Sequence, residues 1–378
     1  MRSVLMISRL CAIFWLQCLW AANGLDTWTL RSSPLPSTNW LYAIIYANGQ
    51  FVAVGGTSPA TWQGAGVILR STDGTSWTQA TIPGGTGTLR SVTSGQGTYV
   101  AAGRTIINSL DGKSWGPSLS GGSGYSAVAH GNNLFVAASY PYIYISTNNA
   151  NTWTRYPLAG FEFSLSLIAF GNDEFVAVGG HGGVGGISTS TNGTMWSGKL
   201  SDYLVRSICY GGGIYVAVGG KGTMKVSPET TTWTTGNSGT TNNLLGVGFG
   251  GGVFVAVGSR GTILTSTDAT TWAPRASSVT NDLTAVAFGN GHFVAVGANG
   301  TILESGAVLH LGQSKALSNG AFQLTLTGAS GQRCEVQSSP DLTNWTELTE
   351  FVLAEPSITI VITSPTNFSQ RFYRAVAP

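Results

Sequence analysis

The chain has 378 residues, of which 42% are hydrophobic, 9% are charged and 53 are glycine, and its formal net charge is +2. Glycine is about twice as frequent as its average usage of ~7%, and charged residues fall far below the usual ~25%. This composition excludes a disordered chain, and a charge this small without any basic block argues against a nucleic-acid-binding protein.

The N-terminal segment 1–24 has the pattern of a secretory signal peptide. Arg2 and Arg9 flank the apolar run Leu10–Ala22, and small residues follow at a plausible cleavage region. The run is shorter than the ~20 apolar residues that a transmembrane helix needs. We therefore expect a bacterial protein that is secreted or held in the cell envelope, with no transmembrane segment after signal removal. The alternative is that the run is an ordinary buried segment.

Seven short runs of one type, each led by an aromatic residue, recur after this segment. Their leading aromatics are 48, 36, 40, 40, 39 and 39 residues apart. The runs are Phe51–Gly55, Tyr99–Gly103, Phe135–Ser139, Phe175–Gly179, Tyr215–Gly219, Phe254–Gly258 and Phe293–Gly297. A period near 40 with short β-type runs is typical of a β-propeller. The pattern predicts an all-β fold with a seven-bladed propeller over residues 25–306.

The seventh repeat shows three of the expected strands, at Leu283–Phe288, His292–Gly297 and Thr301–Ser305, separated by Asn-Gly-type turns. The other six repeats add a fourth strand that opens on a tryptophan: Trp77, Trp115, Trp153, Trp196, Trp233 and Trp272. The seventh lacks it, and Trp28 near the mature N-terminus copies the end of a repeat. We expect the Trp28 strand to complete blade seven and close the ring, which removes exposed sheet edges.

The turn before these tryptophans has a recurring phrase, for which Ser71–Trp77 is the clearest case. Its acid is Asp73, Asp111 or Asp268 in three repeats, and Asn148 or Asn192 in two others. A carboxylate or amide oxygen at this place accepts backbone N–H bonds across the turn. Because asparagine replaces the acid in two copies, we interpret these residues as structural rather than catalytic, with the tryptophan covering the hairpin.

Two phrases carry a resemblance to known families. The Ser-x-Asp turn with its tryptophan resembles the Asp-box of bacterial neuraminidase-type repeats, although only Ser146–Trp153 keeps the full spacing. Ala256–Ser266 and Ala295–Ser305 resemble the propellers of photosystem II stability/assembly factors. The resemblance covers about residues 26–306. It implies a non-enzymatic scaffold, while nothing else in the chain indicates photosynthesis. We expect no cofactor.

The period is lost after Gly306. Residues 307–318 are predicted to be a linker, and 319–378 a small antiparallel β-sandwich-like domain. Its expected strands are Ala321–Leu326, Arg333–Ser338, Thr346–Val352, Ile358–Ile362 and Arg371–Ala375. Val336–Trp345 and the terminal Arg371–Arg374 resemble a C-terminal module of secreted bacterial repeat proteins. Cys209 and Cys334 fall in different domains, so we expect buried, inert thiols rather than a disulfide.

Ligands of propellers usually meet the mouth of the central channel, which is built from the turns between strands two and three and the links between blades. The residues predicted at this mouth are Trp62, Arg104, Tyr140, Tyr142, His181, Lys221 and Arg260. Arg90 and Arg206 occupy the same register near the start of a first strand. A pair of inward-pointing arginines can grip a carboxylate or a phosphate. The alternative is that each pairs with a neighbour and seals the channel.

These observations predict a secreted, non-enzymatic binding or scaffolding propeller, monomeric, with an unknown protein, peptide or surface glycan as partner. One alternative is a neuraminidase-like or other glycan-cleaving hydrolase, with Arg90, Arg206 and Arg260 as a triad or Glu162 and Asp202 as paired acids. Another is a structural adhesion component of the cell surface. No metal site is predicted, because the four histidines lie in separate segments without companion ligands.

Overall fold

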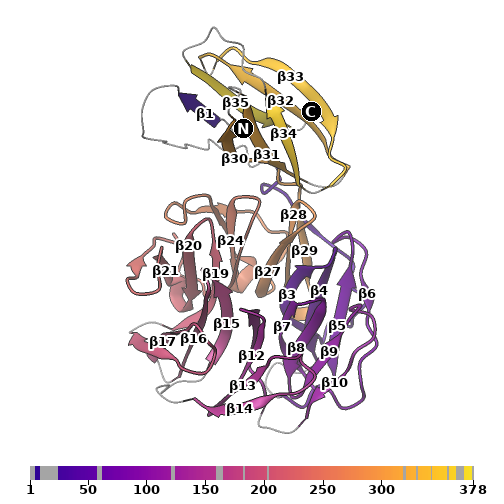
Figure 1. Ribbon diagram of the computed structural model, residues 1–378. Coiled ribbons are helices and arrows are strands. Elements are labelled where there is room, and N and C mark those ends of the chain that lie inside the picture. The colour runs from indigo at the N-terminus through magenta and orange to yellow at the C-terminus, as the bar shows by residue number, and fades with distance from the viewer. Residues whose placement is uncertain are drawn as a thin grey trace. The chain divides into compact units, whose positions relative to one another are not determined.

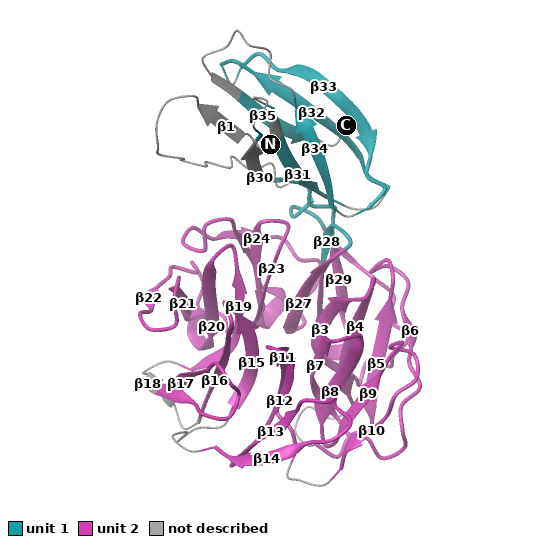
Figure 2. Cartoon of the chain, viewed as in Figure 1, with its two compact units in different colours: residues 1–27, 290–293, 305–378 teal, residues 28–289, 294–304 magenta. Residues whose placement is uncertain are grey.

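The structure is a computed structural model that describes residues 5–8, 24–57, 62–120, 124–158, 165–181, 184–201, 204–317, 321–328, 331–341, 343–355, 357–362 and 370–376. The chain forms two compact units, which Figure 2 shows in different colours. The larger comprises residues 28–289 and 294–304, and the smaller comprises residues 1–27, 290–293 and 305–378. None of the described helices has the length and hydropathy that a membrane crossing requires.

Seven four-stranded antiparallel sheets build the propeller, as the 40-residue period predicts (Figure 1). The strands of the first three blades are β3 (Trp40–Ala47), β4 (Gln50–Gly56), β5 (Gly66–Ser71), β6 (Thr78–Gln79), β7 (Leu89–Gly95), β8 (Thr98–Gly103), β9 (Ile106–Ser109), β10 (Gly116–Leu119), β11 (Ala127–Gly131), β12 (Leu134–Ser139), β13 (Tyr142–Ser146) and β14 (Thr154–Pro157). Those of the next three are β15 (Leu165–Gly171), β16 (Glu174–His181), β17 (Val184–Ser190), β18 (Ser197–Ser201), β19 (Val205–Gly211), β20 (Ile214–Gly219), β21 (Met224–Ser227), β22 (Thr234–Thr235), β23 (Leu244–Gly250), β24 (Val253–Gly258), β25 (Ile263–Ser266) and β26 (Ala273–Arg275). We call the first strand of each blade its inner strand.

Blade seven is completed by the N-terminal strand, so the predicted closure of the ring is confirmed. Its strands are β27 (Leu283–Gly289), β28 (His292–Gly297), β29 (Ile302–Ser305) and β2 (Trp28–Leu30), hydrogen-bonded in that order. The Arg31 amide donates to the Ile302 carbonyl at 2.9 Å. The Arg31 guanidinium also pairs with Glu304, with Nε and Oε2 2.5 Å apart. The first and last parts of the propeller sequence therefore share one sheet.

The second strand of each blade reads as an unbroken apolar run because both of its faces are covered. In β4, Phe51 and Ala53 pack with Val294 of blade seven. Val52 and Val54 belong to the cluster shared with blade two. Alternate residues of one strand thus fill two different interfaces between blades, which accounts for the recurring Phe-Val-Ala-Val phrase.

Blades also interlock through glycines at the ends of the inner strands. A Cβ atom added to any of six of these glycines would lie 2.1–2.4 Å from a side chain of the next blade. The glycine and side-chain pairs are Gly95 with His130, Gly131 with Phe170, Gly171 with Tyr210, Gly211 with Phe249, Gly250 with Phe288, and Gly289 with Tyr46. Blade one departs from this pattern, because Ala47 and Ser94 stand in the corresponding places. There the Tyr99 hydroxyl donates to the Ala47 carbonyl at 2.6 Å instead.

The turns before the tryptophans are held by the hydrogen bonds that their sequence implies. Asp73 Oδ1 accepts the Thr75 and Ser76 amides at 2.9 and 2.8 Å, and Trp77 Nε1 donates to the Gly74 carbonyl at 2.8 Å. Asn192 Oδ1 makes the same two backbone contacts in blade four, both at 3.0 Å. The Asp73 carboxylate and the Asn192 carboxamide therefore stabilise their turns in the same way.

The same turn geometry at Asp268 predicts that the stability of the fold depends on pH. Partial burial raises the pKa of Asp268, but hydrogen bonds from the Thr271 and Thr270 amides outweigh it and lower the pKa to about 2. The folded-state pKa then lies below the unfolded value of about 3.9, so the carboxylate stabilises the fold above pH ~4 and loses this contribution as the pH falls toward ~2. Denaturant unfolding at several pH values is expected to show wild type and Asp268→Asn converging as the pH falls. A constant difference between the two would contradict this reading.

The smaller unit is a sandwich of two antiparallel sheets, as the C-terminal pattern predicts. One sheet has the order β1 (Leu5–Ser8), β35 (Gln370–Val376), β32 (Arg333–Ser339), β33 (Thr346–Val352), and the other has β30 (His310–Ala316), β31 (Phe322–Thr327), β34 (Ser357–Ile362). Both contribute to one core, which includes Leu311, Leu324, Val336 and Tyr373.

Two details of this unit differ from the expectation. Strand β30 lies inside the segment 307–318 that the loss of the period indicated as a linker. Leu311 anchors it in the core, whereas most of its residues are polar, which hid the strand in the sequence. Strand β1 lies inside the predicted signal peptide, whose cleavage stays a prediction. Burial raises the pKa of both predicted inert thiols, to about 11 for Cys334. Cys334 is buried, and Cys209 is partly exposed and packs against the core shared by blades five and six.

Candidate functional site: the channel cavity

A local irregularity recurs at the start of the inner strands. In five blades the pairing of the inner strand with its neighbour skips the second or third residue of the inner strand, which leaves that residue as a bulge. The bulged residues are Tyr42, Arg90, Ser166, Arg206 and Leu245. A bulge redirects a side chain that regular pairing would point elsewhere. All five line one central cavity.

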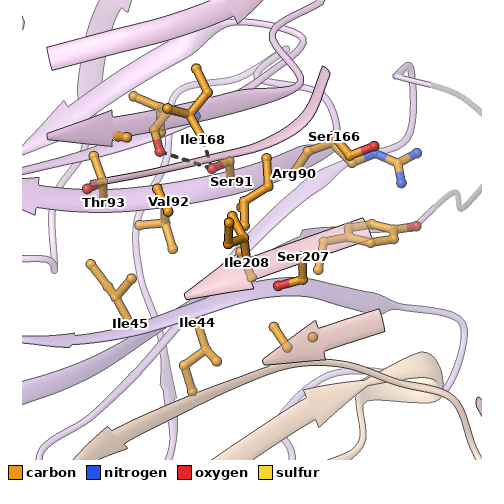
Figure 3. A pocket seen from close by; sticks show the side chains of 18 of the residues that line it. Ile44, Ile45, Arg90, Ser91, Val92, Thr93, Ser166, Ile168, Ser207 and Ile208 are labelled. Carbon is orange, nitrogen blue, oxygen red and sulfur yellow. Dashed lines mark hydrogen bonds between the residues drawn. The ribbon is translucent and has the colours of Figure 1, made fainter. Parts of the chain in front are cut away.

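This channel cavity has a volume of about 370 Å³ and is lined by the inner strands of all seven blades. Figure 3 shows Arg90 and Ser91 of β7 and Ser207 of β19 among the lining residues. The two arginines share a local design, because each is followed by a serine that docks on the next blade. Ser91 Oγ donates to the Val128 carbonyl at 3.3 Å, and Ser207 Oγ accepts the Val247 amide at 3.3 Å. The serine hydrogen-bonds the inner strand to the next blade, and the bulge places the arginine in the cavity lining.

Arg90 is held between two aromatic rings. Its Cζ lies 4.1 Å from the centre of the Tyr42 ring and 5.4 Å from that of the Trp62 ring. Both distances fall within the range of cation–π attraction. Trp62 is itself fixed, since its carbonyl accepts the Thr88 amide at 3.2 Å and its ring lies against Gly124. The two rings therefore orient the guanidinium by its faces.

The charge of the cavity is positive. Its lining includes Arg90 and Arg206 and contains no aspartate or glutamate among the described residues. His130, deeper along its inner strand, also lines the cavity, and burial lowers the pKa of this imidazole. Burial raises the pKa of the Tyr42 hydroxyl, and the nearby Arg90 charge partly opposes that effect. At neutral pH the two arginines are therefore the charged groups of the lining.

Only some of the residues predicted at the channel mouth lie at the channel cavity. Arg90 and Arg206 line the cavity, and Trp62 stacks on Arg90. The others do not belong to the described cavity lining: Arg104, Tyr140, Tyr142, Lys221 and Arg260. His181 ends β16, and its side chain lies outside the described residues.

Lys221 and Arg260 lie on the turns between strands two and three, outside the cavity lining. Each is the middle residue of a short 3-10 turn, η1 (Gly220–Gly222) or η2 (Ser259–Gly261), with a left-handed φ of 54° or 58°. Their amides donate to Asn243 Oδ1 at 2.9 Å and Asp282 Oδ1 at 3.1 Å. Both side chains are exposed. Tyr142, by contrast, is covered by Arg155, whose Cζ lies 4.4 Å from its ring centre.

The residues proposed for glycan cleavage are not assembled in the described part of the chain. Arg260 lies on an exposed turn and does not join Arg90 and Arg206 in the cavity lining. Glu162 and Asp202 lie outside the described residues. Within the described ranges, no three His, Cys, Asp or Glu side chains gather as metal ligands would.

Sequence reasoning missed Tyr42. The register that links Arg90 to Arg206 also places Tyr42 at the equivalent position of blade one, so extending that register would have identified it. The contact between Tyr42 and Arg90 was harder to predict from the sequence, because it requires the bulges of two adjacent blades to project into the same channel.

The comparisons with known proteins support the fold. No protein-family model matches the sequence, and no curated protein matches it either. Among solved structures, YCF48 from Cyanidioschyzon merolae is similar, with 17% identity, a TM-score of 0.56 and coverage of 74% of this chain and 98% of that one. A catalytically inactive virginiamycin B lyase from Staphylococcus aureus, with quinupristin, has 12% identity, a TM-score of 0.62 and coverage of 75% and 100%.

A third similar structure is PorZ, an essential surface component of the type-IX secretion system of Porphyromonas gingivalis. It has 11% identity and a TM-score of 0.53, and the match covers 84% of this chain and 54% of that one. At these identities the likenesses establish a propeller fold. They agree at that level with the resemblance to assembly-factor propellers and assign no activity.

Proposed function

We propose that this chain is a secreted, non-enzymatic propeller that binds a peptide through a carboxylate at the channel cavity. The observation that carries the proposal is Arg90, oriented between Tyr42 and Trp62 in a cavity whose described lining has no acid. A guanidinium edge binds a carboxylate in a bidentate manner, and a low local dielectric strengthens the bond. Arg206 adds a second positive charge to the same cavity.

Two considerations favour a peptide as the partner. YCF48, which shares the fold at 16% identity and a TM-score of 0.59, has been solved bound to a D1 peptide. The remaining cavity lining is mostly aliphatic, hydroxyl-bearing and backbone surface, which suits an extended peptide end better than a highly hydroxylated sugar. The free C-terminal carboxylate of a peptide, or an acidic side chain, would meet Arg90.

A display library of peptides with free C-termini would supply probes, and each selected peptide would be compared with its C-terminally amidated form by fluorescence anisotropy. Arg90→Ala is expected to weaken binding about ten- to hundredfold, because it removes a charge-assisted hydrogen-bonded pair. Arg90→Lys should recover only part of the affinity, since lysine keeps the charge but lacks the planar fork.

The matched control is Arg104→Ala, which removes an exposed arginine outside the cavity lining and should leave binding unchanged. If Arg104→Ala weakened binding as much as Arg90→Ala, the arginines would act through net charge alone. If Arg90→Ala bound every selected peptide like wild type, the channel cavity would not be the site.

A further inference from the structure

The turn before Trp153 differs from its counterparts in other blades. Ser146–Trp153 has one residue more than Ser71–Trp77, and two successive residues, Asn149 and Ala150, adopt left-handed φ values of 57° and 60°. The Ala150 side chain is fully buried, and its carbonyl accepts a hydrogen bond from Ser118 Oγ of blade two.

The tryptophan of this turn also changes its partner. In five blades the indole N–H donates to a carbonyl of its own turn, as in Trp77 to Gly74. Trp153 Nε1 instead donates to Ser118 Oγ of blade two at 2.9 Å. The longer turn is therefore tied to the neighbouring blade, and Asn149 projects beside the blade-two turn.

A second cavity of about 380 Å³, the rim notch, lies at this junction. Its lining comprises Thr98, Asn108, Ser109, Leu110, Ser114, Asn149 and Asn151. The volume lies within the roughly 300–1,000 Å³ range of small-molecule sites. None of the seven is charged, and three of them are carboxamides. This set differs in kind from the arginine-bearing channel cavity.

Several polar groups of the rim notch lack partners within the described residues. Thr98 is 2% exposed, and its Oγ1 is buried without a hydrogen bond. The desolvation cost of this hydroxyl is not offset by a hydrogen bond within the described residues. Asn108 and Asn149 make no side-chain hydrogen bond there either. Leu110, 79% exposed at the edge of the notch, adds an aliphatic surface.

From this chemistry we infer that the rim notch is a binding site for a neutral saccharide. Sugar hydroxyls donate and accept at once, and carboxamides and hydroxyls offer both functions in return. The aliphatic Leu110 suits the C–H face of a pyranose ring, and the uncharged lining disfavours phosphate, sulfate or sialic acid. This site is separate from the channel cavity and does not depend on the proposed peptide binding.

The test uses the purified full chain on an array of neutral oligosaccharides of glucose, galactose, mannose and N-acetylglucosamine, with sialylated and sulfated glycans as a second set, followed by calorimetric titration of each hit. At least one neutral saccharide is expected to bind. Asn108→Ala/Asn149→Gly should weaken it at least tenfold, because glycine keeps the left-handed backbone while both amides are lost. Asn48→Gly, which changes an exposed left-handed asparagine of blade one, is the matched control and should bind like wild type.

Three outcomes would overturn the inference. One is that no neutral saccharide on the array binds the folded wild-type chain. Another is that the double variant, folded by its thermal unfolding curve, binds with wild-type affinity. The third is that only sialylated or sulfated glycans bind and that Arg90→Ala abolishes the binding, which would place sugar recognition at the channel cavity. A double variant that fails to fold would be replaced by Leu110→Ser, for which the same tenfold loss is expected.

Discussion

Replacing Trp28 with alanine is expected to lower the free energy of unfolding of the propeller by about 3–5 kcal/mol, the usual cost of truncating a buried tryptophan. Trp28 is 6% exposed in β2, the only strand of blade seven that comes from the other end of the propeller sequence among the described residues. The loss removes packing from the sheet that closes the ring, so the effect should reach the whole propeller. Denaturant unfolding followed by circular dichroism measures it.

Leu30→Ala in the same strand is the matched control. Leu30 is 56% exposed, so its truncation should change the unfolding free energy by no more than about 0.5 kcal/mol. Equal effects of the two substitutions would mean that burial of the Trp28 ring adds no stability of its own. A negligible effect of Trp28→Ala would mean that the N-terminal strand does not close the ring in solution.

Gly211→Ala should destabilise the propeller by about 1–3 kcal/mol or more, although it adds a single methyl group. The new Cβ would lie 2.1 Å from Cγ of Phe249 in the next blade, a separation that forces the blades apart. The substitution is also expected to alter the channel cavity, because Gly211 ends the inner strand β19 that carries Arg206. Thermal unfolding of the variant measures the first effect.

Gly84→Ala is the control, since its added Cβ meets no atom within 4 Å and its φ is not left-handed. It should be neutral or stabilise by up to about 1 kcal/mol through the unfolded state. At one junction between blades the chain already combines a larger residue with a smaller partner: Ala47 replaces the glycine, and Ser94 replaces the bulky ring. A Gly211→Ala/Phe249→Ser double variant should therefore cost less than the sum of the two single changes. Strict additivity would show that this contact does not set the spacing of the blades.

The overall architecture was predictable because a propeller repeats its signals. Seven leading aromatics against six repeat tryptophans left one strand missing, and Trp28 was the remaining candidate. The pairing of Arg90 with Arg206 was likewise visible, because both precede a serine at the same distance from the next Phe-Val-Ala-Val-type run. Regular spacing along the chain thus translates directly into equivalent places in the ring.

What the sequence concealed depends on contacts between neighbouring blades. Tyr42 and Arg90 are 48 positions apart, and only the two bulges bring them together. The match of Gly211 to Phe249 follows from blade packing rather than from any local pattern. The extra residue before Trp153 was visible in the sequence, but its bond to Ser118 and the rim notch beside it required the three-dimensional arrangement.

The central claim is that β2 closes the ring and so places all seven inner strands around one cavity. Hydrogen exchange at the Arg31 amide, which donates to the Ile302 carbonyl, tests it most directly. The account predicts that this amide exchanges as slowly as the amides of β28, because both would open only with the blade. Exchange at the rate of an unstructured peptide, with β28 still protected, would show an open ring and contradict the account.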